Sequence, residues 1–368
     1  MKRTAIQYLI NRLSQCCQAI PADAEPARCL AFAIIGCLAS LPLFAAPPTT
    51  ETNGEISQAV VGEQTIQYTT VIYRNIGDVQ LQADVFLPAG RQSRPALMWI
   101  HGGALIFGDR SMLHPSLSSE LLRYLQAGIA VVSIDYRLAP ETKLPEIASD
   151  VQAAWSWMHE EGQRAFAFDP ERMAIAGQSA GGYLTLLAGS LLSPKPTALV
   201  AFYGYGDLSA QWLTEPSPFY CKQLPMVTEE NARAAVGPLA ANAAAANRAS
   251  FYLWCRQQGR WPLEVTGFDP QSALDQLERY CPAKQVTDDY PPTMLLHGDQ
   301  DTDVPYAQSQ QMAQALLQQG IECHFMPQRG YGHGFDSALD NDAVVAHSFD
   351  AVISFLKHHL QPIAPIQP

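Results

Sequence analysis

Basic residues are scarce in this sequence. Its 23 Lys and Arg are outnumbered by 35 Asp and Glu, which leaves a formal net charge of −12 at pH 7 with histidine neutral. A surface of this sign repels a phosphate backbone, so we expect no nucleic-acid partner. Cysteine pairs with C-x-x-C spacing and internal repeats of fixed period are also missing. Zinc sites and repeat architectures are therefore disfavoured, and nothing in the sequence implies a metal or an organic cofactor.

Long apolar runs are equally scarce, and the one that stands out covers residues 29–46. It follows a basic stretch and ends in small residues, which is typical of a secretory signal cleaved near Ala45 or Ala46. The alternatives are an uncleaved membrane anchor and a lipoprotein signal that leaves Cys37 acylated. In each case we expect residues 1–46 to be a signal peptide or membrane anchor and the protein to be exported, periplasmic or secreted. Any membrane contact would be made through this segment.

Four cysteines lie beyond this leader: Cys221, Cys255, Cys281 and Cys323. In an exported protein a disulfide among the first three is chemically permitted, and buried thiols are the alternative. Spacing alone assigns no connectivity.

The rest of the chain alternates between strand and helix patterns. Residues 65–73 and 79–87 alternate polar and apolar positions on either side of a turn, which predicts an antiparallel hairpin. Residues 95–100 and 129–134 are continuously apolar, as strands buried on both faces are. Further strands are predicted at 173–176, 198–203, 293–296 and 322–326, and helices at 146–161, 183–192, 306–319 and 344–360. This order predicts an α/β fold with a mostly parallel central sheet flanked by helices.

Two segments interrupt this alternation. Residues 47–64 are polar and rich in Pro and Thr, which predicts a linker. Residues from about 205 to 290 break the rhythm and predict an insertion between two core strands, with a helix-like run at 229–248. Such an insertion could cap a substrate entrance. The main domain is thus expected at 65–360, followed by a C-terminal tail at 361–368.

The strongest chemical signal is Gly-Gln-Ser-Ala-Gly-Gly at residues 177–182, between a predicted strand and an apolar helix. In this setting G-x-S-x-G is the sharp turn that exposes a nucleophilic serine. Gly177 and Gly181 allow the strand and the helix to approach closely. The helix N-terminus then directs free N–H groups towards an oxyanion beside Ser179. Ser179 is therefore the predicted nucleophile.

A glycine-rich loop, His-Gly-Gly-Ala-Leu-Ile-Phe-Gly at residues 101–108, follows a buried strand. Small residues there leave backbone N–H groups free to converge on a negative charge. We predict Gly103 and Ala104, together with Ala180 after the nucleophile, as the donors of an oxyanion hole. The alternative is an ordinary glycine-rich turn. His101 is expected to hold the loop rather than to act as a base.

Three aspartates follow the strand predicted at 293–296, where the acid of a serine–acid–histidine series is expected. Asp301 is favoured because its spacing from the next Val-Pro pair suits a turn that aims the carboxylate at the site. Asp303 is the second candidate, and Asp299 is expected to stabilise the turn. A calcium loop is disfavoured because the later glutamate is missing, so no metal site is predicted.

Among nine histidines, His333 has both the expected order and the expected setting. It lies between two glycines, after a predicted strand and before the last helix. Its imidazole would take the proton of Ser179 and later return it to the leaving alcohol. Ser179, Asp301 and His333 form the predicted catalytic triad.

Together these motifs resemble the hormone-sensitive-lipase-like branch of the α/β-hydrolases, the relatives of acetyl esterases and carboxylesterases. Residues 101–108 resemble its H-G-G-G-x-x-x-G loop, and D-Y-R-L-A-P-E at residues 135–141 matches its signature. Ser179, Asp301 and His333 fall on its triad positions. The resemblance implies the α/β-hydrolase fold and hydrolysis of a small-molecule carboxylic ester, with short acyl chains, through an acyl-enzyme.

The sequence departs from this family at two residues and in one segment. Ala104 replaces the third glycine of the loop, which narrows it and would disfavour bulky alcohols. Gln178 replaces the acid that often precedes the nucleophile, and the insertion follows the nucleophile, whereas the family builds its cap largely from N-terminal helices. Two other functions are weighed. A prolyl-oligopeptidase-like serine peptidase shares the triad order, but no propeller-like repeat precedes the catalytic region. A non-catalytic binding protein of this fold would be expected to have lost a triad member.

Overall fold

The computed structural model describes residues 56–61, 64–90 and 93–362. The predicted signal or anchor at 1–46, its Cys37, and most of the C-terminal tail lie outside these residues.

The described residues form one nine-stranded sheet in the order β1-β2-β3-β5-β4-β6-β7-β8-β9. Strands β1, β2 and β3 pair antiparallel with each other, and β3 pairs antiparallel with β5. All pairs from β5 to β9 across the sheet are parallel. The strand bounds are β1 Ile56–Val61, β2 Gln64–Ile76, β3 Val79–Phe86, β4 Arg94–Ile100, β5 Ala130–Ile134, β6 Phe168–Gln178, β7 Leu199–Phe202, β8 Thr293–Gly298 and β9 Cys323–Gln328. The predicted α/β fold with a mostly parallel sheet is confirmed, as is the hairpin β2–β3.

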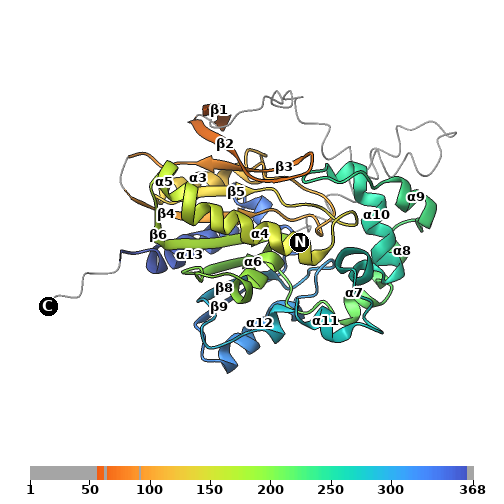
Figure 1. Cartoon of the computed structure of the whole chain (residues 1–368). Helices are drawn as coiled ribbons and strands as arrows, with labels where there is room; N and C mark the ends of the chain where they lie inside the picture. The colour runs from red at the N-terminus through yellow and green to blue at the C-terminus, as the bar shows by residue number, and fades with distance from the viewer. Residues whose placement is uncertain (1–55, 62–63, 91–92, 363–368) are drawn as a thin grey trace.

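Helices cover both faces of this sheet (Figure 1). The α-helix bounds are α3 Ser118–Gln126, α4 Leu144–Trp157, α5 Gln163–Phe166, α6 Ala180–Leu191, α7 Gln211–Thr214, α8 Pro218–Gln223, α9 Glu229–Ala234, α10 Ala245–Gln258, α11 Leu274–Glu278, α12 Ala307–Gln318 and α13 Ala343–His359. The π-helical turns are Met158–Gly162 and Pro262–Thr266, and the 3-10 turns are Pro282–Lys284 and Phe335–Ala338.

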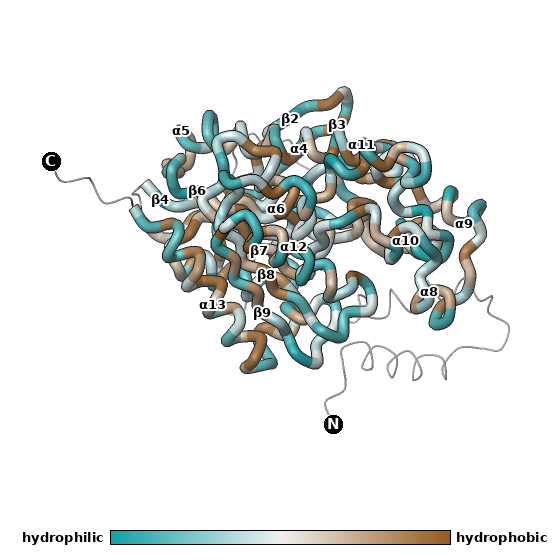
Figure 2. The backbone as a smooth tube through the Cα atoms, turned by 90° about the horizontal axis from the view of Figure 1, so that it is seen from below, coloured by the Kyte–Doolittle hydropathy of each residue, from teal (hydrophilic) through white to brown (hydrophobic). Residues whose placement is uncertain are grey.

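Two apolar cores lie on opposite sides of the sheet. Along β4, Met98 and Ile100 join the core beneath α4, α6 and α12, while Leu97 and Trp99 join the core beneath α3 and α13. Because successive side chains of a strand point to opposite faces, a continuously apolar strand serves both cores at once. Figure 2 shows hydrophobic and hydrophilic stretches alternating along the chain, as expected for helices that cover a sheet with one side only.

Two predictions differ from the structure. The linker predicted over residues 47–64 contains strand β1, which extends the sheet at its edge; its short length and exposed side chains make it resemble a linker in sequence. The helix-like run at 229–248 is wrong as a single helix, because α9 ends at Ala234 and α10 begins at Ala245. Pro238 lies between them, and proline lacks the N–H that a continuous helix requires. The four body cysteines are free thiols in the structure.

The insertion lies between β7 and β8 and contains α7 to α11. Figure 1 shows these five helices gathered at one end of the sheet. Gly108, which follows β4, pairs with Ala243 of the insertion. The insertion therefore stands at the carboxyl ends of the parallel strands, where the loops that carry the motifs emerge.

Candidate active site

Ser179 occupies a strained turn between β6 and α6. Its φ and ψ are 54° and −118°, a conformation that side-chain-bearing residues rarely adopt, and its N–H donates to the carbonyl oxygen of Phe202 at 2.9 Å. A Cβ at Gly181 would lie 1.9 Å from the carbonyl oxygen of Ile100, and one at Gly177 would lie 2.5 Å from the carbonyl oxygen of Gly181. The two glycines thus allow the close backbone packing that holds the turn, as the sequence predicts.

Two hydrogen bonds connect Ser179 to His333 and His333 to Asp301. The Ser179 hydroxyl donates to His333 Nε2 at 2.9 Å, and His333 Nδ1 donates to Asp301 Oδ2 at 2.7 Å. The other carboxylate oxygen, Oδ1, accepts the backbone N–H groups of Asp303 at 2.8 Å and Val304 at 2.9 Å. The carboxylate is thereby fixed, and it orients the imidazole with Nε2 facing the hydroxyl.

Both titratable members of this series have shifted pKa values. Burial would raise the pKa of Asp301, but hydrogen bonds from His297 and His333 hold it well below its usual range. Burial would lower the pKa of His333, but the hydrogen bond and charge of Asp301, with the charges of Asp303 and Asp336, raise it above its ordinary value. The result is an ionised carboxylate beside a strengthened base, which is the arrangement that general-base catalysis requires.

The glycine-rich loop passes directly beside Ser179. A Cβ at Gly102 would lie 3.3 Å from Ser179 Cβ. The loop turns through left-handed conformations at Gly103, with φ 105°, and at Ala104, with φ 56°. Ala180 is the first residue of α6, where a backbone N–H has no partner within the helix. These positions suit the predicted oxyanion-hole donors, whose role stays a prediction.

Side chains of the main domain hold this loop in place. The Tyr136 hydroxyl, part of the D-Y-R-L-A-P-E segment, donates to the carbonyl oxygen of His101 at 3.0 Å. The His101 ring stacks on Tyr136 with centroids 4.2 Å apart, and its Nδ1 lies 2.7 Å from the carbonyl oxygen of Gly102. Burial lowers the pKa of His101 to about 4, so the ring is neutral at ordinary pH. His101 is a structural residue of the loop, as expected.

Side chains of the insertion also donate hydrogen bonds to this loop. Trp261 Nε1 donates to the carbonyl oxygen of Ala104 at 3.1 Å. Arg248 donates to the carbonyl oxygen of Ile106 at 3.1 Å and pairs with Glu141 at 2.8 Å. The insertion therefore supports the conformation of the loop as well as lying close to it.

A further ion pair joins the insertion to the loop that carries the acid. Arg256 of α10 pairs with Asp303 Oδ1 at 2.5 Å, and the Tyr252 hydroxyl donates to the same oxygen. Asp303 Oδ2 lies 3.7 Å from His333 Nε2. Asp303 is thus not the acid that orients His333, which is Asp301, yet it faces the reactive nitrogen.

A buried polar group lies next to Ser179 and His333. The Tyr203 hydroxyl is 2.5 Å from Gln178 Oε1 and 2.6 Å from Asp336 Oδ1, and its ring lies 4.5 Å from that of His333. One phenol proton cannot serve two acceptors, so either Asp336 carries a proton or the Gln178 amide is turned to donate. Burial raises the pKa of Asp336. The neutral Gln178 spares this group another negative charge.

Three residues at the site have no role predicted from the sequence: His297 on β8, and Arg256 and Tyr252 in the insertion. His297 is the second-last residue of β8, its Nε2 lies 3.3 Å from Asp301 Oδ2, and the Ser309 hydroxyl oxygen lies 2.7 Å from its Nδ1. Arg256 and Tyr252 come from the insertion and carry no motif. His297 has a sequence signal, since it opens His-Gly-Asp after a strand, whereas the other two have none.

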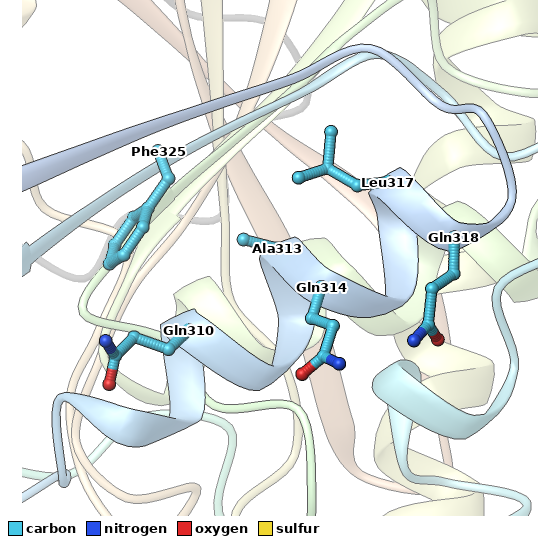
Figure 3. Close-up of a pocket in the computed structure, with 6 residues that line it drawn as sticks. All are labelled: Gln310, Ala313, Gln314, Leu317, Gln318 and Phe325. Carbon is cyan, nitrogen blue, oxygen red and sulfur yellow. The ribbon is translucent and has the colours of Figure 1, made fainter.

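Other features of the described residues lie apart from this site. A surface hollow between α12 and β9 is lined by Gln310, Ala313, Gln314, Leu317, Gln318 and Phe325 (Figure 3). None of these residues contributes to the hydrogen-bonded series at Ser179. Within residues 56–61, 64–90 and 93–362 no cluster of His, Cys, Asp and Glu is arranged to hold a metal ion. In the same ranges no helix combines the length and hydrophobicity that crossing a bilayer needs.

Comparison with known proteins places this geometry in a family. A family model described as alpha/beta hydrolase fold matches residues 97–337. The carboxylic ester hydrolase LipN of Mycobacterium tuberculosis is 35% identical over 144 residues, which cover 39% of this chain and 36% of LipN. The non-reducing polyketide synthase pkbA of Emericella nidulans is 26% identical over 353 residues, covering 79% of this chain. This chain spans only 14% of that synthase, so the likeness concerns one part of a much longer protein.

A solved structure shows the same fold. Carboxyl esterase 2 of Tuber melanosporum superposes with a TM-score of 0.58 at 20% identity, covering 90% of this chain and 98% of the esterase. The resemblance inferred from the motifs is confirmed, and the chain belongs to the α/β-hydrolase family, in its hormone-sensitive-lipase-like branch.

Proposed function

We propose that this chain is a serine esterase that hydrolyses carboxylic esters through an acyl-enzyme on Ser179. The observation that carries the proposal is the unbroken series of two hydrogen bonds, Ser179 to His333 at 2.9 Å and His333 to Asp301 at 2.7 Å. A serine hydroxyl bonded to an oriented imidazole is the arrangement that nucleophilic catalysis needs. The esterase names carried by LipN and the Tuber protein support the same conclusion.

Acylation and deacylation use the same three side chains. Ser179 Oγ attacks the ester carbonyl as its proton moves to His333 Nε2, and the negative charge of the tetrahedral intermediate falls on the carbonyl oxygen. The backbone N–H groups of Gly103, Ala104 and Ala180 are the proposed donors to that oxygen. His333 then gives its proton to the leaving alcohol oxygen as the carbon–oxygen bond breaks. Water, activated by the same imidazole, releases the acid and restores Ser179.

Short acyl groups are the proposed substrates. Ala104 places a methyl group in the oxyanion loop, where the family has glycine, and Trp261 is bonded to the same residue at 3.1 Å. Phe107 and Tyr252 pack edge to face nearby, with centroids 6.1 Å apart. We infer that these side chains limit the room for a long acyl chain. A series of p-nitrophenyl esters from acetate to laurate tests this, and we expect kcat/KM to fall as the acyl chain lengthens.

The catalytic assignment is tested by Ser179→Ala. Turnover of p-nitrophenyl acetate should fall to the level without enzyme, whereas the matched variant Ser354→Ala, at an exposed position on α13, should retain it. Full activity of Ser179→Ala would contradict the proposal. Faster hydrolysis of dipeptide amides than of acyl esters would favour a peptidase, and failure of the wild type to react with a fluorophosphonate would favour a binding protein.

A further inference from the structure

Asp303 lies next to the nitrogen that delivers the proton to the leaving group. Its Oδ2 is 3.7 Å from His333 Nε2, the same nitrogen that accepts the Ser179 hydroxyl. For proton transfer the leaving oxygen must come within about 2.6–3.2 Å of Nε2. Whatever is attached to that oxygen therefore passes within reach of Asp303 Oδ2.

The insertion fixes this carboxylate in place. Arg256 Nη1 donates to Asp303 Oδ1 at 2.5 Å, and Arg256 Nη2 donates to the Asp303 carbonyl oxygen at 3.0 Å. The Tyr252 hydroxyl also donates to Oδ1. The Arg256 side chain is 3% exposed while that of Asp303 is 21% exposed. The guanidinium is thus buried and holds Oδ1, while Oδ2 faces His333 Nε2.

A carboxylate in this position accepts hydrogen bonds and repels negative charge. An alcohol with a second hydroxyl on the carbon adjacent to the one that bears the ester oxygen can donate to Oδ2 while its ester oxygen meets Nε2. An alcohol with a carboxylate at that place is repelled, and a plain alkyl alcohol must desolvate Asp303 without compensation.

We propose that Asp303, held by Arg256, determines specificity for the alcohol half of the ester and favours monoesters of polyols. This inference rests on the esterase function proposed above and deepens it. The substrate class is a short-chain acyl ester of a vicinal diol, as in a partially acylated polyol or sugar, with the free hydroxyl donating to Asp303 Oδ2.

The test compares two esters that differ by one group. In 2-hydroxyethyl acetate and propyl acetate the acyl group and the chain length are the same, and a hydroxyl replaces a methyl. The ratio of their kcat/KM values reports the alcohol side, because this constant covers the steps up to alcohol release. We expect the wild type to favour the hydroxyethyl ester by about tenfold or more, as one hydrogen bond to a charged group provides.

Two substitutions at Asp303 should abolish this preference. Asp303→Asn keeps the shape and removes the charge, and Asp303→Leu also removes the acceptor. Both variants change the electrostatic environment of His333, but that effect is common to the two esters and cancels in the ratio. We expect the ratio to fall several-fold in Asp303→Asn and to approach or pass below one in Asp303→Leu. The matched control Asp288→Asn, at an exposed position before β8, should leave the ratio unchanged.

The possible outcomes separate the inference from the function on which it rests. A wild-type ratio near one, or a ratio that stays the same in the Asp303 variants, overturns the inference while ester hydrolysis stands. No hydrolysis of either ester by folded wild type overturns both. If the variants fail to fold because Arg256 loses its partner, a wild-type series that adds carboxymethyl acetate decides. Preference for hydroxyethyl over propyl over carboxymethyl supports the inference, and any other order contradicts it.

Discussion

The substitution Asp301→Asn tests how the carboxylate controls the proton on His333. Asp301 Oδ1 accepts two backbone N–H groups, at 2.8 and 2.9 Å, and backbone donors cannot change their role. The asparagine oxygen must therefore occupy the Oδ1 position, which turns its NH2 group towards His333 Nδ1. Facing a donor, Nδ1 loses its proton and Nε2 takes it. The imidazole is then held in the tautomer that cannot accept the proton of Ser179.

The size of the effect follows from the contacts that the active tautomer would have to give up. Restoring the proton to Nδ1 loses the hydrogen bond from the asparagine amide, about 0.5–1.5 kcal/mol, and leaves two donors facing each other at about 1–3 kcal/mol. The sum of about 1.5–4.5 kcal/mol corresponds to a fall in kcat of about 10–10³-fold at about 1.4 kcal/mol per tenfold. His297 does not relieve this, because its Nε2 keeps the carbonyl oxygen of Val304 at 3.0 Å.

The assay is the steady-state hydrolysis of p-nitrophenyl acetate by the wild type and Asp301→Asn, with thermal unfolding of both as a check on folding. The nitrogen chemical shifts of His333 in the variant should show the proton on Nε2. A folded Asp301→Asn enzyme with less than a tenfold loss of kcat, or with the proton still on Nδ1, would refute the reasoning.

Three further predictions concern pH, stability and packing. Because the pKa of His333 lies above its ordinary value, kcat/KM should fall as the pH drops through a midpoint above 6.5; a midpoint below 6.5 in a pH–rate profile would contradict this. Burial and the charge of Asp336 raise the pKa of Glu120 from 4.5 to about 8. The folded state therefore keeps a proton that the unfolded chain loses, and stability should decline between about pH 4.5 and pH 8 by up to about 5 kcal/mol. The free energy of unfolding measured in urea should depend less on pH in Glu120→Gln than in the wild type. An unchanged pH dependence in this variant would contradict the assignment to Glu120. Gly181→Ala puts a methyl 1.9 Å from the Ile100 carbonyl oxygen, so a soluble variant with wild-type melting temperature and activity would contradict the packing described for the turn.

The convergence of Ser179, Asp301 and His333 could be predicted because each follows a strand. The carboxyl ends of parallel strands meet at one edge of the sheet, so Ser179 after β6, Asp301 after β8 and His333 after β9 converge without further information. The choice between Asp301 and Asp303 was harder, since both follow the same strand. It depends on which carboxylate accepts the backbone N–H groups of the turn, and this is a property of the folded loop.

The contribution of the insertion could not be predicted from local patterns. Arg256 lies 47 positions before Asp303 in a segment without a motif, and its role depends on how α10 docks. The prediction of one helix over residues 229–248 was wrong, and the sequence itself shows the reason, because Pro238 interrupts the run. The sequence gives little sign of strand β1, because a short edge strand is defined by its backbone pairing with β2 and hardly by its side chains.

The most direct test of the account is to trap the acyl-enzyme. The protein is mixed with p-nitrophenyl acetate, quenched in acid within the first turnovers, and digested for mass spectrometry. The account predicts one acetyl group on the peptide that contains Ser179, with none in Ser179→Ala and far less in His333→Ala. An acetyl group that accumulates on another residue at the rate of turnover, or ester hydrolysis that continues undiminished in Ser179→Ala, would contradict it.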